Sequence, residues 1–404
     1  MGIRLLTAGE SHGKGMTLIL SGFPSGIRVS RERFRQELFR RRKGFGRSPR
    51  MKLEKDEFEV LSGLRGGVTT GAPLAVFIPN VEAQEWTKVL DPWDASAKSS
   101  ALTAPRPGHA DLAGALKFAR LSNGKLVPAD IRNIIERASA RQTVATYFAG
   151  ALCKFLLEEL LVETASFVFQ VGKARLSQKA LNKLLEARER RDIPLEVIDR
   201  SVVRIPDDKI SQKAVDEIER ARKAGTTLGG GVVAFAFNVP VGVGSYCQWD
   251  DRLDGKIAQA IMAIPGVKAV GIGGAFWKYG LLGSSYHGDI FRKNGGITYA
   301  RNSDGGLSGG ITNGMPVVVT ALMKPLSTQA RPLKTVDLRT GKSTEAIVER
   351  HDVTSVPAVS LIAENTLAFV LAREILETFG GDEITIIRER VALQRERLSN
   401  LFNG

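Results

Sequence analysis

Histidine is scarce in this chain of 404 residues, and each of its four copies, His12, His109, His287 and His351, has Gly, Asp or Arg beside it. Histidine titrates near neutral pH, so a ring held in a polar turn can donate or accept a proton during a reaction. For any one of them, the alternative is a ring that only hydrogen-bonds its own turn. Two such polar turns favour proton-transfer chemistry, because active sites are common on loops held by a rigid scaffold.

The two turns nearest the N-terminus are GESHG at residues 9–13 and RPGHAD at residues 106–111. In the first, flanking glycines permit a tight backbone that presents a carboxylate, a hydroxyl and an imidazole together. In the second, a Pro-Gly pair forms the turn, and Arg106 and Asp111 place both signs of charge around His109. Both turns are therefore candidate catalytic loops.

The chain carries a formal net charge of +14, which implies anionic partners such as nucleic acid, a membrane surface or small polyanions. Arginines cluster with glycine at residues 40–50, and guanidinium groups bind phosphates and carboxylates bidentately. A solvated basic face is the alternative for this run. Its single aromatic residue, Phe45, is too little for the stacking platforms of single-strand nucleic-acid binding.

Composition indicates an ordinary soluble globular protein, with 43% hydrophobic and 25% charged residues and a length that fits one large or two ordinary domains. Cys153 and Cys247 are too few and too far apart for a disulfide framework, which fits a reducing cytoplasm. The first polar motif begins before an apolar run of signal-peptide length, and no window is apolar enough to span a membrane.

The sequence lacks the common nucleotide and metal motifs. The glycines at residues 242–247 lack the third member of a dinucleotide fingerprint, and neither a phosphate-binding GxxxxGK[ST] nor a zinc-binding HExxH occurs. No metal site is expected, and a cofactor would be bound by another scaffold.

The first candidate turn lies between two short apolar runs, residues 3–6 and 17–20, which we predict to be strands. Ser30 is placed to cap a helix over residues 30–42 that ends at Gly44. This helix would bring the arginine run to its C-terminal end.

Further along, residues 129–163 have helical spacing that is interrupted near residues 137–141, so this arginine pair is predicted at a helix start or within a helix that faces the site. Residues 171–225 are predicted to form a charged, solvated helical excursion. The remaining predicted elements are strands at 57–62, 74–79, 232–237, 269–272 and 317–322, a helix at 254–263, and one or two closing helices at 364–400. Irregular alternation of strands and helices predicts one mixed α/β domain over residues 1–404.

Six motifs together resemble the chorismate synthase family in order and spacing over nearly the whole chain: GESHG, RPGHAD, RASAR at 137–141, GGITNG at 309–314, KPLST at 324–328 and RHD at 350–352. The resemblance implies an α+β single-domain sandwich of β-sheets around helices. It also implies a homotetramer with an active site in each subunit, and neither nucleic acid nor membrane as a partner.

The implied activity is conversion of 5-enolpyruvylshikimate 3-phosphate to chorismate and phosphate, a step of the shikimate pathway towards aromatic amino acids. Reduced FMN would be required without net redox change, and NADPH is a possible source of electrons for the flavin. Such a 1,4-elimination needs charge neutralised at the leaving group and a base at the far carbon.

By resemblance, His12 is the acid that protonates the departing phosphate, and His109 protonates or stabilises the reduced flavin. Asp352, with Ser11 and Ser139, would support removal of the ring proton through the flavin. The implied flavin contacts are Arg137, Ala138, Ser139, Gly309, Lys324, Pro325, Leu326, Ser327, Thr328 and Arg350, and the implied NADPH contacts are Arg41 and Arg47. Substrate and flavin together would bring two carboxylates and two phosphates into the site. These anionic groups would explain why several arginines converge there.

The chain departs from the family pattern at several places. The link at 119–128 is longer than usual, Gln142 stands where an acid usually follows, and Val353 and Thr354 replace Pro and Cys. A further flavin contact near residues 265–266 does not match and is not assigned. Of the other histidines, we interpret His287 as a structural residue satisfied by Asp289, and His351 as orienting its neighbours Arg350 or Asp352.

Two other functions remain open on the sequence. The net charge alone would suit a basic nucleic-acid-binding protein, whose affinity would fall steeply with salt. A flavin-dependent oxidoreductase acting on a phosphorylated substrate would consume reduced FMN, whereas the lyase would not.

Overall fold

The first sheet comes from the N-terminal part of the chain. In the computed structural model, which describes residues 2–47, 57–93, 101–293, 296–349 and 352–401, its order is β1 (Arg4–Gly9), β2 (Gly15–Ser21), β6 (Leu74–Pro79) and β3 (Glu59–Ser62), all antiparallel. Alternate residues of β2 and β6 are buried, as expected for a sheet with one covered face. The four predicted strands in this region are confirmed.

The second sheet is also antiparallel and lies deeper in the molecule. Its order is β10 (Ala174–Arg175), β9 (Glu163–Val171), β11 (Gly230–Phe237), β17 (Val317–Met323) and β12 (Val267–Ile272). Strand β11 is buried along nearly its whole length. The predicted strands at 232–237, 269–272 and 317–322 are confirmed, whereas β9 falls in a stretch between two predicted helical segments.

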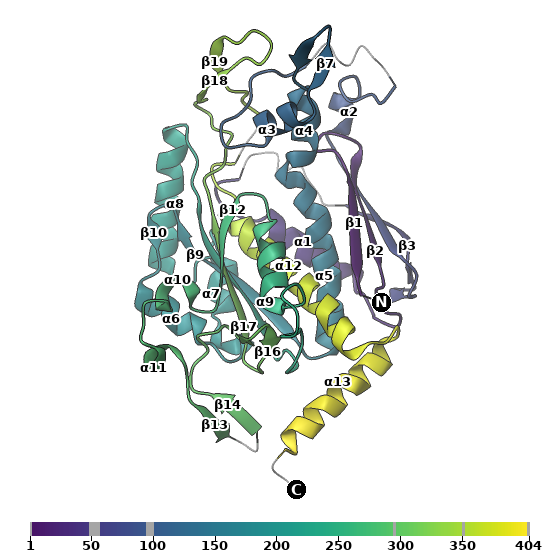
Figure 1. The fold of residues 1–404 in the computed structure, drawn as a ribbon, viewed down its shortest axis with the longest axis vertical. Coiled ribbons are helices and arrows are strands. Elements are labelled where there is room, and N and C mark those ends of the chain that lie inside the picture. The colour runs from purple at the N-terminus through teal and green to yellow at the C-terminus, as the bar shows by residue number, and fades with distance from the viewer. Residues whose placement is uncertain (1, 48–56, 94–100, 294–295, 350–351, 402–404) are drawn as a thin grey trace.

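Two long helices, α5 (Thr143–Glu159) and α12 (Val356–Phe379), lie between the sheets (Figure 1). Helix α5 contacts β1 and β2, α12 contacts β9 and β11, and the two helices pack against each other. Both are apolar on most of their circumference, which is typical of helices enclosed on all sides. The predicted sandwich of sheets around helices is thereby confirmed, and α12 begins eight residues before its predicted start.

A smaller group of elements forms the upper end of the molecule in Figure 1. Helices α3 (Asp111–Lys117) and α4 (Ile131–Ala138) pack together there, with Ala115, Ile131 and Ile135 buried between them. The long link between these helices forms a hairpin, β7 (Arg120–Ser122) and β8 (Lys125–Val127), and a second hairpin, β18 (Lys334–Val336) and β19 (Ser343–Glu345), lies at the same end of the molecule.

The predicted helix after Ser30 is α1 (Arg31–Arg42), and the Ser30 side chain accepts a hydrogen bond from the backbone of Arg33, as expected of an N-cap. The charged segment 171–225 is helical as predicted, with α6 (Gln178–Leu185), α7 (Leu195–Arg200) and α8 (Asp208–Lys223). It is not simply solvated, because Leu181, Ile198 and Ile218 are buried in the main core. Helix α8 packs against β9 and β10, at one edge of the second sheet.

The remaining elements are short or peripheral: β4 (Leu64–Arg65), β5 (Val68–Thr69), α2 (Ala83–Trp86), α9 (Leu253–Met262), α10 (Ala275–Lys278), α11 (Gly283–Tyr286), β13 (Ile290–Lys293), β14 (Gly296–Tyr299), β15 (Leu307–Ser308), β16 (Ile311–Thr312) and α13 (Ile384–Ser399). Within the described part of the chain, no helix combines the length and apolar character that a membrane span requires.

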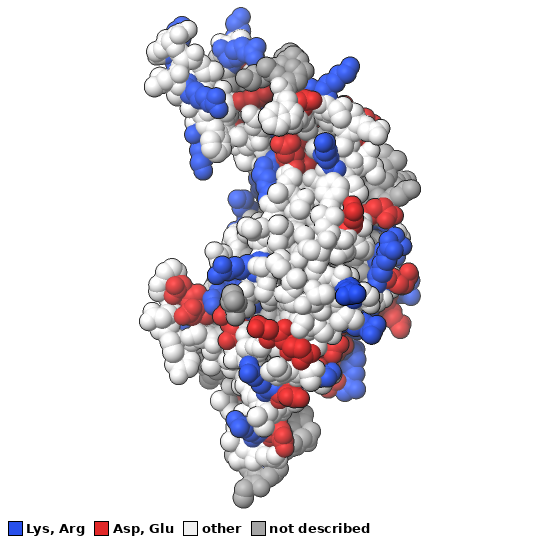
Figure 2. All heavy atoms as spheres, turned by 90° about the vertical axis from the view of Figure 1, so that its right-hand side faces the viewer, with Lys and Arg blue, Asp and Glu red and all other residues white. Residues whose placement is uncertain are grey.

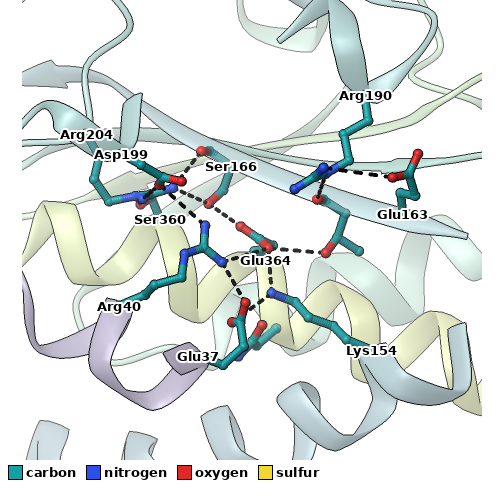
Figure 3. A network of polar contacts seen from close by, with 12 residues as sticks. Glu37, Arg40, Lys154, Glu163, Ser166, Arg190, Asp199, Arg204, Ser360 and Glu364 are labelled. Carbon is teal, nitrogen blue, oxygen red and sulfur yellow. Dashed lines mark hydrogen bonds and ion pairs between the residues drawn. The ribbon is translucent and has the colours of Figure 1, made fainter. Parts of the chain in front are cut away.

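Charged side chains are enclosed within the sandwich, where α1, α5 and α12 meet (Figure 3). Lys154 Nζ lies 2.5 Å from Glu364 Oε1 and 3.1 Å from Glu37 Oε2, and Arg40 lies 2.8 Å from Glu37. Ser166 from β9 donates to Glu364 at 2.6 Å. Burial alone would raise the pKa of Glu364, but Lys154 and Arg40 outweigh burial and hold this pKa well below its ordinary value.

The network continues to Arg204, which bonds Ser360 at 3.0 Å and Asp199 at 2.7 Å. Three carboxylates thus face three cations, so the group is close to neutral as a whole. Buried charges are tolerated only when paired in this way.

Candidate functional site

The turn between β1 and β2 presents His12 against the C-terminal half of α4. The His12 backbone donates to Glu136 Oε2 at 2.8 Å, and His12 Nδ1 lies 2.8 Å from Glu136 Oε1. The backbone of Ser11 donates to the Glu136 carbonyl at 2.9 Å. Because one glutamate holds both the main chain and the ring, the orientation of the imidazole is fixed.

Two further side chains complete the surroundings of His12. Its ring lies against Trp86 of α2, with centroids 4.2 Å apart, and the Arg132 guanidinium lies over the same indole at 4.9 Å. Arg132 also pairs with Glu136 at 3.4 Å and with Glu349 at 3.0 Å. None of these partners was predicted, because they lie far from His12 in sequence.

The charge state of Glu136 follows from these contacts. Its side chain is 4% exposed, and burial alone would raise the pKa of the carboxyl. The hydrogen bonds from His12 and the charge of Arg132 outweigh burial, so the pKa is lowered. Glu136 is therefore an ionised acceptor beside the imidazole.

The His12 turn is also held from its other side. Arg141 donates to the Ser11 carbonyl at 2.7 Å and to Asn80 Oδ1 at 2.6 Å, and Asn80 donates to the Gly13 carbonyl at 2.9 Å. Ser11 Oγ donates to Ser139 Oγ at 3.0 Å, so two of the predicted site serines lie together.

The predicted interruption of the helical segment near residues 137–141 is confirmed, and the RASAR motif there spans the last residues of α4 and the turn that leads into α5. Arg137 and Ala138 close α4, Ser139 is extended, and a short 3-10 turn at Ala140–Gln142 leads into α5. Arg137 donates to the carbonyl and hydroxyl of Thr7 at 3.0 and 2.8 Å. It borders a pocket of about 470 Å³ lined also by the glycines of the His12 turn, Lys14, Asn133 and Glu136.

The second histidine has a closely similar arrangement. His109 Nδ1 lies 2.5 Å from Asp111 Oδ1, and Arg106 binds Asp111 Oδ2 through Nε at 2.8 Å. Asp111 is fully buried at the start of α3. Its burial would raise the carboxyl pKa, but the hydrogen bonds from His109 and Arg106 outweigh burial and hold the pKa well below its ordinary range.

The KPLST motif lies beside this second turn. Arg106 donates to Thr328 Oγ1 at 2.9 Å, Ser327 donates to the Gly108 carbonyl at 2.8 Å, and Lys324 Nζ donates to the same carbonyl. Gly108 has a φ of +77°, a conformation that favours glycine, and a Cβ there would meet the Lys324 and Ser327 side-chain tips at an ordinary contact distance. Pro325 is exposed, and the Leu326 carbonyl accepts from Thr227 at 2.7 Å.

Burial and the nearby charge of Lys268 lower the pKa of Lys324. The Lys324 backbone donates to the Gly266 carbonyl at 2.9 Å, so the unassigned residues 265–266 adjoin this motif.

Asp352 lies where the loop after α1 meets the start of α12. Its carboxylate pairs with Arg47 Nε at 2.7 Å and accepts from Ser355 at 3.2 Å. The Val353 backbone donates to the Gly46 carbonyl at 2.8 Å, which fastens the two segments. Arg41 is buried on α1. The predicted residues Arg350 and His351 lie outside the described residues.

Gly309 is not brought together with the other predicted residues. It lies in the β15–β16 hairpin, whose Thr312 bonds Val243 and whose Gly310 carbonyl accepts from Leu253. This hairpin adjoins the N-terminal end of β17, whereas Lys324 follows its C-terminal end. Figure 1 shows β16 near the lower end of the molecule and α3 and α4 at the upper end. His287 is exposed at the end of α11, with its ring edge-on to Tyr286.

Comparisons with known proteins cover the whole chain. The family model described as chorismate synthase matches residues 3–376. The chorismate synthase of Moorella thermoacetica is 43% identical over 403 residues, covering 99% of this chain and 100% of that protein. That of Sulfurihydrogenibium sp. is 42% identical, covering 98% and 100%. A solved structure titled "Crystal Structure of Chorismate Synthase" aligns with a TM-score of 0.78 and 35% identity over 99% of both chains.

Proposed function

The chain belongs to the chorismate synthase family and is a carbon–oxygen lyase of the shikimate pathway; from this premise we propose that it converts 5-enolpyruvylshikimate 3-phosphate to chorismate and phosphate by 1,4-elimination. Reduced FMN is required without net redox change. The observation that carries the proposal is the pair of histidines, each held through Nδ1 by a buried carboxylate.

We assign His12 to the leaving-group end of the reaction. Breaking the carbon–oxygen bond leaves negative charge on the departing phosphate, and a positioned acid there lowers the barrier. Glu136 supports a protonated ring because its own carboxylate is ionised. Arg137 and Lys14, which border the adjoining pocket, add positive charge for an anionic substrate.

The residues around His109 fit a flavin. The set offers an ammonium, two hydroxyls, a guanidinium and an imidazole from Lys324, Ser327, Thr328, Arg106 and His109, which are the donors that a phosphate and the flavin carbonyls need. When bound, reduced FMN supplies electron density and a basic nitrogen to the reaction. Arg137, Ala138 and Ser139 at the end of α4 are proposed as further contacts, together with Pro325, Leu326 and Arg350.

Removal of the ring proton is assigned to the side where Asp352 lies. Its carboxylate is held by Arg47 and Ser355, and Ser11 and Ser139 form a hydroxyl pair at the His12 turn. The Arg132–Glu349 ion pair ties the chain just before Asp352 to α4. This link supports a common site for the acid and the base.

The source of electrons for the flavin is proposed to be external. Arg47, one of the two predicted NADPH contacts, is already paired with Asp352, and the other, Arg41, is only 5% exposed. Binding of NADPH to Arg47 would have to break the Arg47–Asp352 ion pair.

We propose a homotetramer, and Gly309 supports this assembly. Strand β17 has seven residues and spans about 20 Å at about 3.3 Å per residue, so one flavin contacting both Lys324 and Gly309 would need the glycine from another copy. The outer face of the first sheet is a candidate contact surface. Leu6, Ile19 and Leu61 are exposed on it, and Figure 2 shows few charged side chains in the middle of this side of the molecule.

The chain is proposed to act as one catalytic domain. The elements at the upper end continue directly into the sandwich through α4 and α5, so no linker separates the two parts at this point. Action in the cytoplasm is supported by two free cysteines, of which Cys153 is buried in α5. Burial raises the pKa of its thiol.

The test is anaerobic turnover of 5-enolpyruvylshikimate 3-phosphate with chemically reduced FMN, following phosphate and chorismate together. We expect His12→Ala and His109→Ala each to lower kcat by about 10²- to 10⁴-fold, the usual contribution of a positioned acid or base. His287→Ala, an exposed histidine at the other end of the molecule, is the matched control and should keep the rate of the unaltered protein.

Absence of turnover beside an active control enzyme would contradict the proposed reaction, and near-normal rates of either variant would contradict its assigned role. Counting flavin oxidised per chorismate formed separates the lyase from an oxidoreductase. The lyase predicts none, whereas an oxidoreductase predicts one per product.

A further inference from the structure

Four side chains, including that of His12, form a closed ring of contacts. The imidazole lies on Trp86, Trp86 lies under Arg132, Arg132 pairs with Glu136, and Glu136 binds His12. They come from three separate parts of the chain: the β1–β2 turn, α2 and α4. Each member touches two others, so no one of them can turn without disturbing its neighbours.

The position of Glu136 determines which ring nitrogen of His12 carries a proton. An ionised carboxylate only accepts hydrogen bonds, so Nδ1, at 2.8 Å, must be the donor. In the neutral ring Nε2 then has no proton, and in the cationic ring the Nε2 proton is the one available for transfer. A flipped imidazole would place carbon atoms against Glu136 and lose this bond.

Arg132 and Trp86 keep the carboxylate and the ring in place. Arg132 lies one turn before Glu136 in α4 and pairs with it through Nη1 at 3.4 Å. The same nitrogen also pairs with Glu349 at 3.0 Å. Trp86 covers the imidazole and prevents it from tilting away from Glu136. The stacked indole also gains from the cation above it.

We propose that Glu136, with Arg132 and Trp86, is a positioning residue that fixes His12 in the Nδ1-protonated form and leaves Nε2 as its working nitrogen. The assignment of Nε2 to phosphate protonation rests on the proposed function. The fixing of the tautomer does not, since it follows from the contacts within the chain.

The other charged groups around this ring of contacts are few among the described residues. Glu10 and Lys14 lie in or next to the His12 turn and border the same pocket as Glu136, Arg141 binds the Ser11 carbonyl, and Glu349 binds Arg132. Glu136 is the carboxylate whose contact with the imidazole is direct.

Nuclear magnetic resonance of protein labelled with ¹⁵N in histidine tests the proposal directly. The four histidines give four sets of signals, and the set lost in His12→Ala identifies His12. We expect the Nδ1-protonated tautomer in the unaltered protein. In Glu136→Gln we expect a mixture of tautomers, because the amide can donate to or accept from Nδ1 and no longer selects one form.

Kinetics provide the second measurement. Glu136→Gln should lower kcat by up to about 10⁴-fold, the effect of losing the carboxylate that holds a proton-transferring histidine in the right tautomer, while KM changes by less than about threefold. Glu136→Asp should recover part of kcat. Arg132→Met offers a second route to the same defect if the first variant folds poorly.

The matched control is Glu374→Gln. Glu374 is also 4% exposed and is held by two cations, Lys256 and Arg373, but it lies in the last part of α12. The Glu374→Gln variant should leave the His12 tautomer and the pH dependence of the reaction rate unchanged.

An Nε2-protonated His12 in the unaltered protein, or a Glu136→Gln variant with unchanged tautomer and kcat, would overturn the proposal. A Glu136→Gln variant with altered tautomer, together with a fully active His12→Ala variant, would support the positioning role and contradict the acid role of His12. Failure of the positioning role of Glu136 and failure of the acid role of His12 are therefore distinguishable.

Discussion

At the scale of the residue, both candidate histidines follow one design. Each donates through Nδ1 to a buried carboxylate, and each carboxylate is also bound by an arginine: Glu136 by Arg132 and Asp111 by Arg106. Burial alone would raise the pKa of both acids, but the hydrogen bond from the histidine, followed by the contribution of the arginine, outweighs burial and lowers the pKa of each. The carboxylate in turn engages Nδ1 and leaves Nε2 as the ring nitrogen without this bond.

Asp111→Asn tests this design at the second histidine. The amide retains the size of the carboxylate but not its charge, which leaves Arg106 as an unbalanced cation beside His109. We expect kcat to fall by up to about 10⁴-fold, because His109 loses the carboxylate that fixes its tautomer, with weaker binding of reduced FMN. Stopped-flow turnover and flavin titration measure both quantities.

Asp192→Asn serves as the control, because Asp192 only caps a surface turn in the segment before α7. An Asp111→Asn variant with the same kcat and FMN affinity as this control would refute the role of the pair.

Some of these partners could be predicted from the sequence, and others could not. Arg106, His109 and Asp111 lie within six residues, so their association was readable from one turn. Glu136 is 124 positions from His12, and the sequence showed only a helix ending in an arginine motif. Trp86 resembled any other partly exposed aromatic residue, because stacking on a histidine leaves no local pattern.

At the scale of the element, helix α4 connects the two parts of the site. It carries Glu136 and Arg137 at one end, packs against α3 that begins with Asp111, and leads through Ser139 into the buried helix α5. Movements of α5 would therefore be transmitted to both histidines. The charged network around Glu364 fixes α5 relative to α1 and α12.

Glu364→Gln tests how much that network stabilises the protein. Removing one partner of a buried ion pair leaves uncompensated charge, so we expect a loss of about 3 to 5 kcal/mol at pH 7. The pKa of Glu364 is lower in the folded protein than in the unfolded chain. Its contribution is thus complete at neutral pH and is lost as the pH falls below about 5.

The difference in stability between the unaltered protein and Glu364→Gln should accordingly shrink on acidification. Urea unfolding at pH 7, 5 and 3.5 measures it. Glu163→Gln, which changes an exposed ion pair at 3.9 Å, should cost less than about 1 kcal/mol at every pH. If the difference in free energy of unfolding between the unaltered protein and Glu364→Gln stays constant with pH, the assigned ionisation of Glu364 is contradicted.

Elements with a local pattern were predictable, and those defined by distant contacts were not. The capped helix Arg31–Arg42 and the alternating strands β2 and β6 follow directly from their sequence. The first turns of α12 were missed because Val356–Pro357 looks like a break, although proline is tolerated at a helix start. Strand β9 is apolar without clear alternation, so its spacing did not separate it from the neighbouring helices.

At the scale of the whole molecule, the outer face of the first sheet, which has few charged side chains in its middle, and the distant Gly309 both support the proposed assembly of several copies. One copy holds two histidine turns at its upper end, and a second copy would contribute its glycine hairpin. A symmetric contact through the sheet face would repeat each apolar side chain on both sides of the interface.

Leu6→Lys tests this contact. Leu6 is 71% exposed, and burying a leucine in an interface contributes about 1.5 to 3 kcal/mol, so a lysine there should weaken assembly by more than about tenfold. Sedimentation velocity at several protein concentrations measures the oligomeric state. Leu121→Lys, 78% exposed on the β7–β8 hairpin, is the control. Equal assembly of both variants would exclude the sheet face.

The position of α12 also determines when the protein can fold during its synthesis. Lys154 and Glu364, which join the two central helices, are 210 positions apart, and the second sheet is covered on one side by a helix that starts at Val356. At about 5 to 20 residues per second, the ribosome needs about 10 s or more to add the last 200 residues. Throughout that interval α5, and the strands β9 and β11 once they emerge, lack α12, so the nascent chain exposes apolar surface until its C-terminal helix emerges.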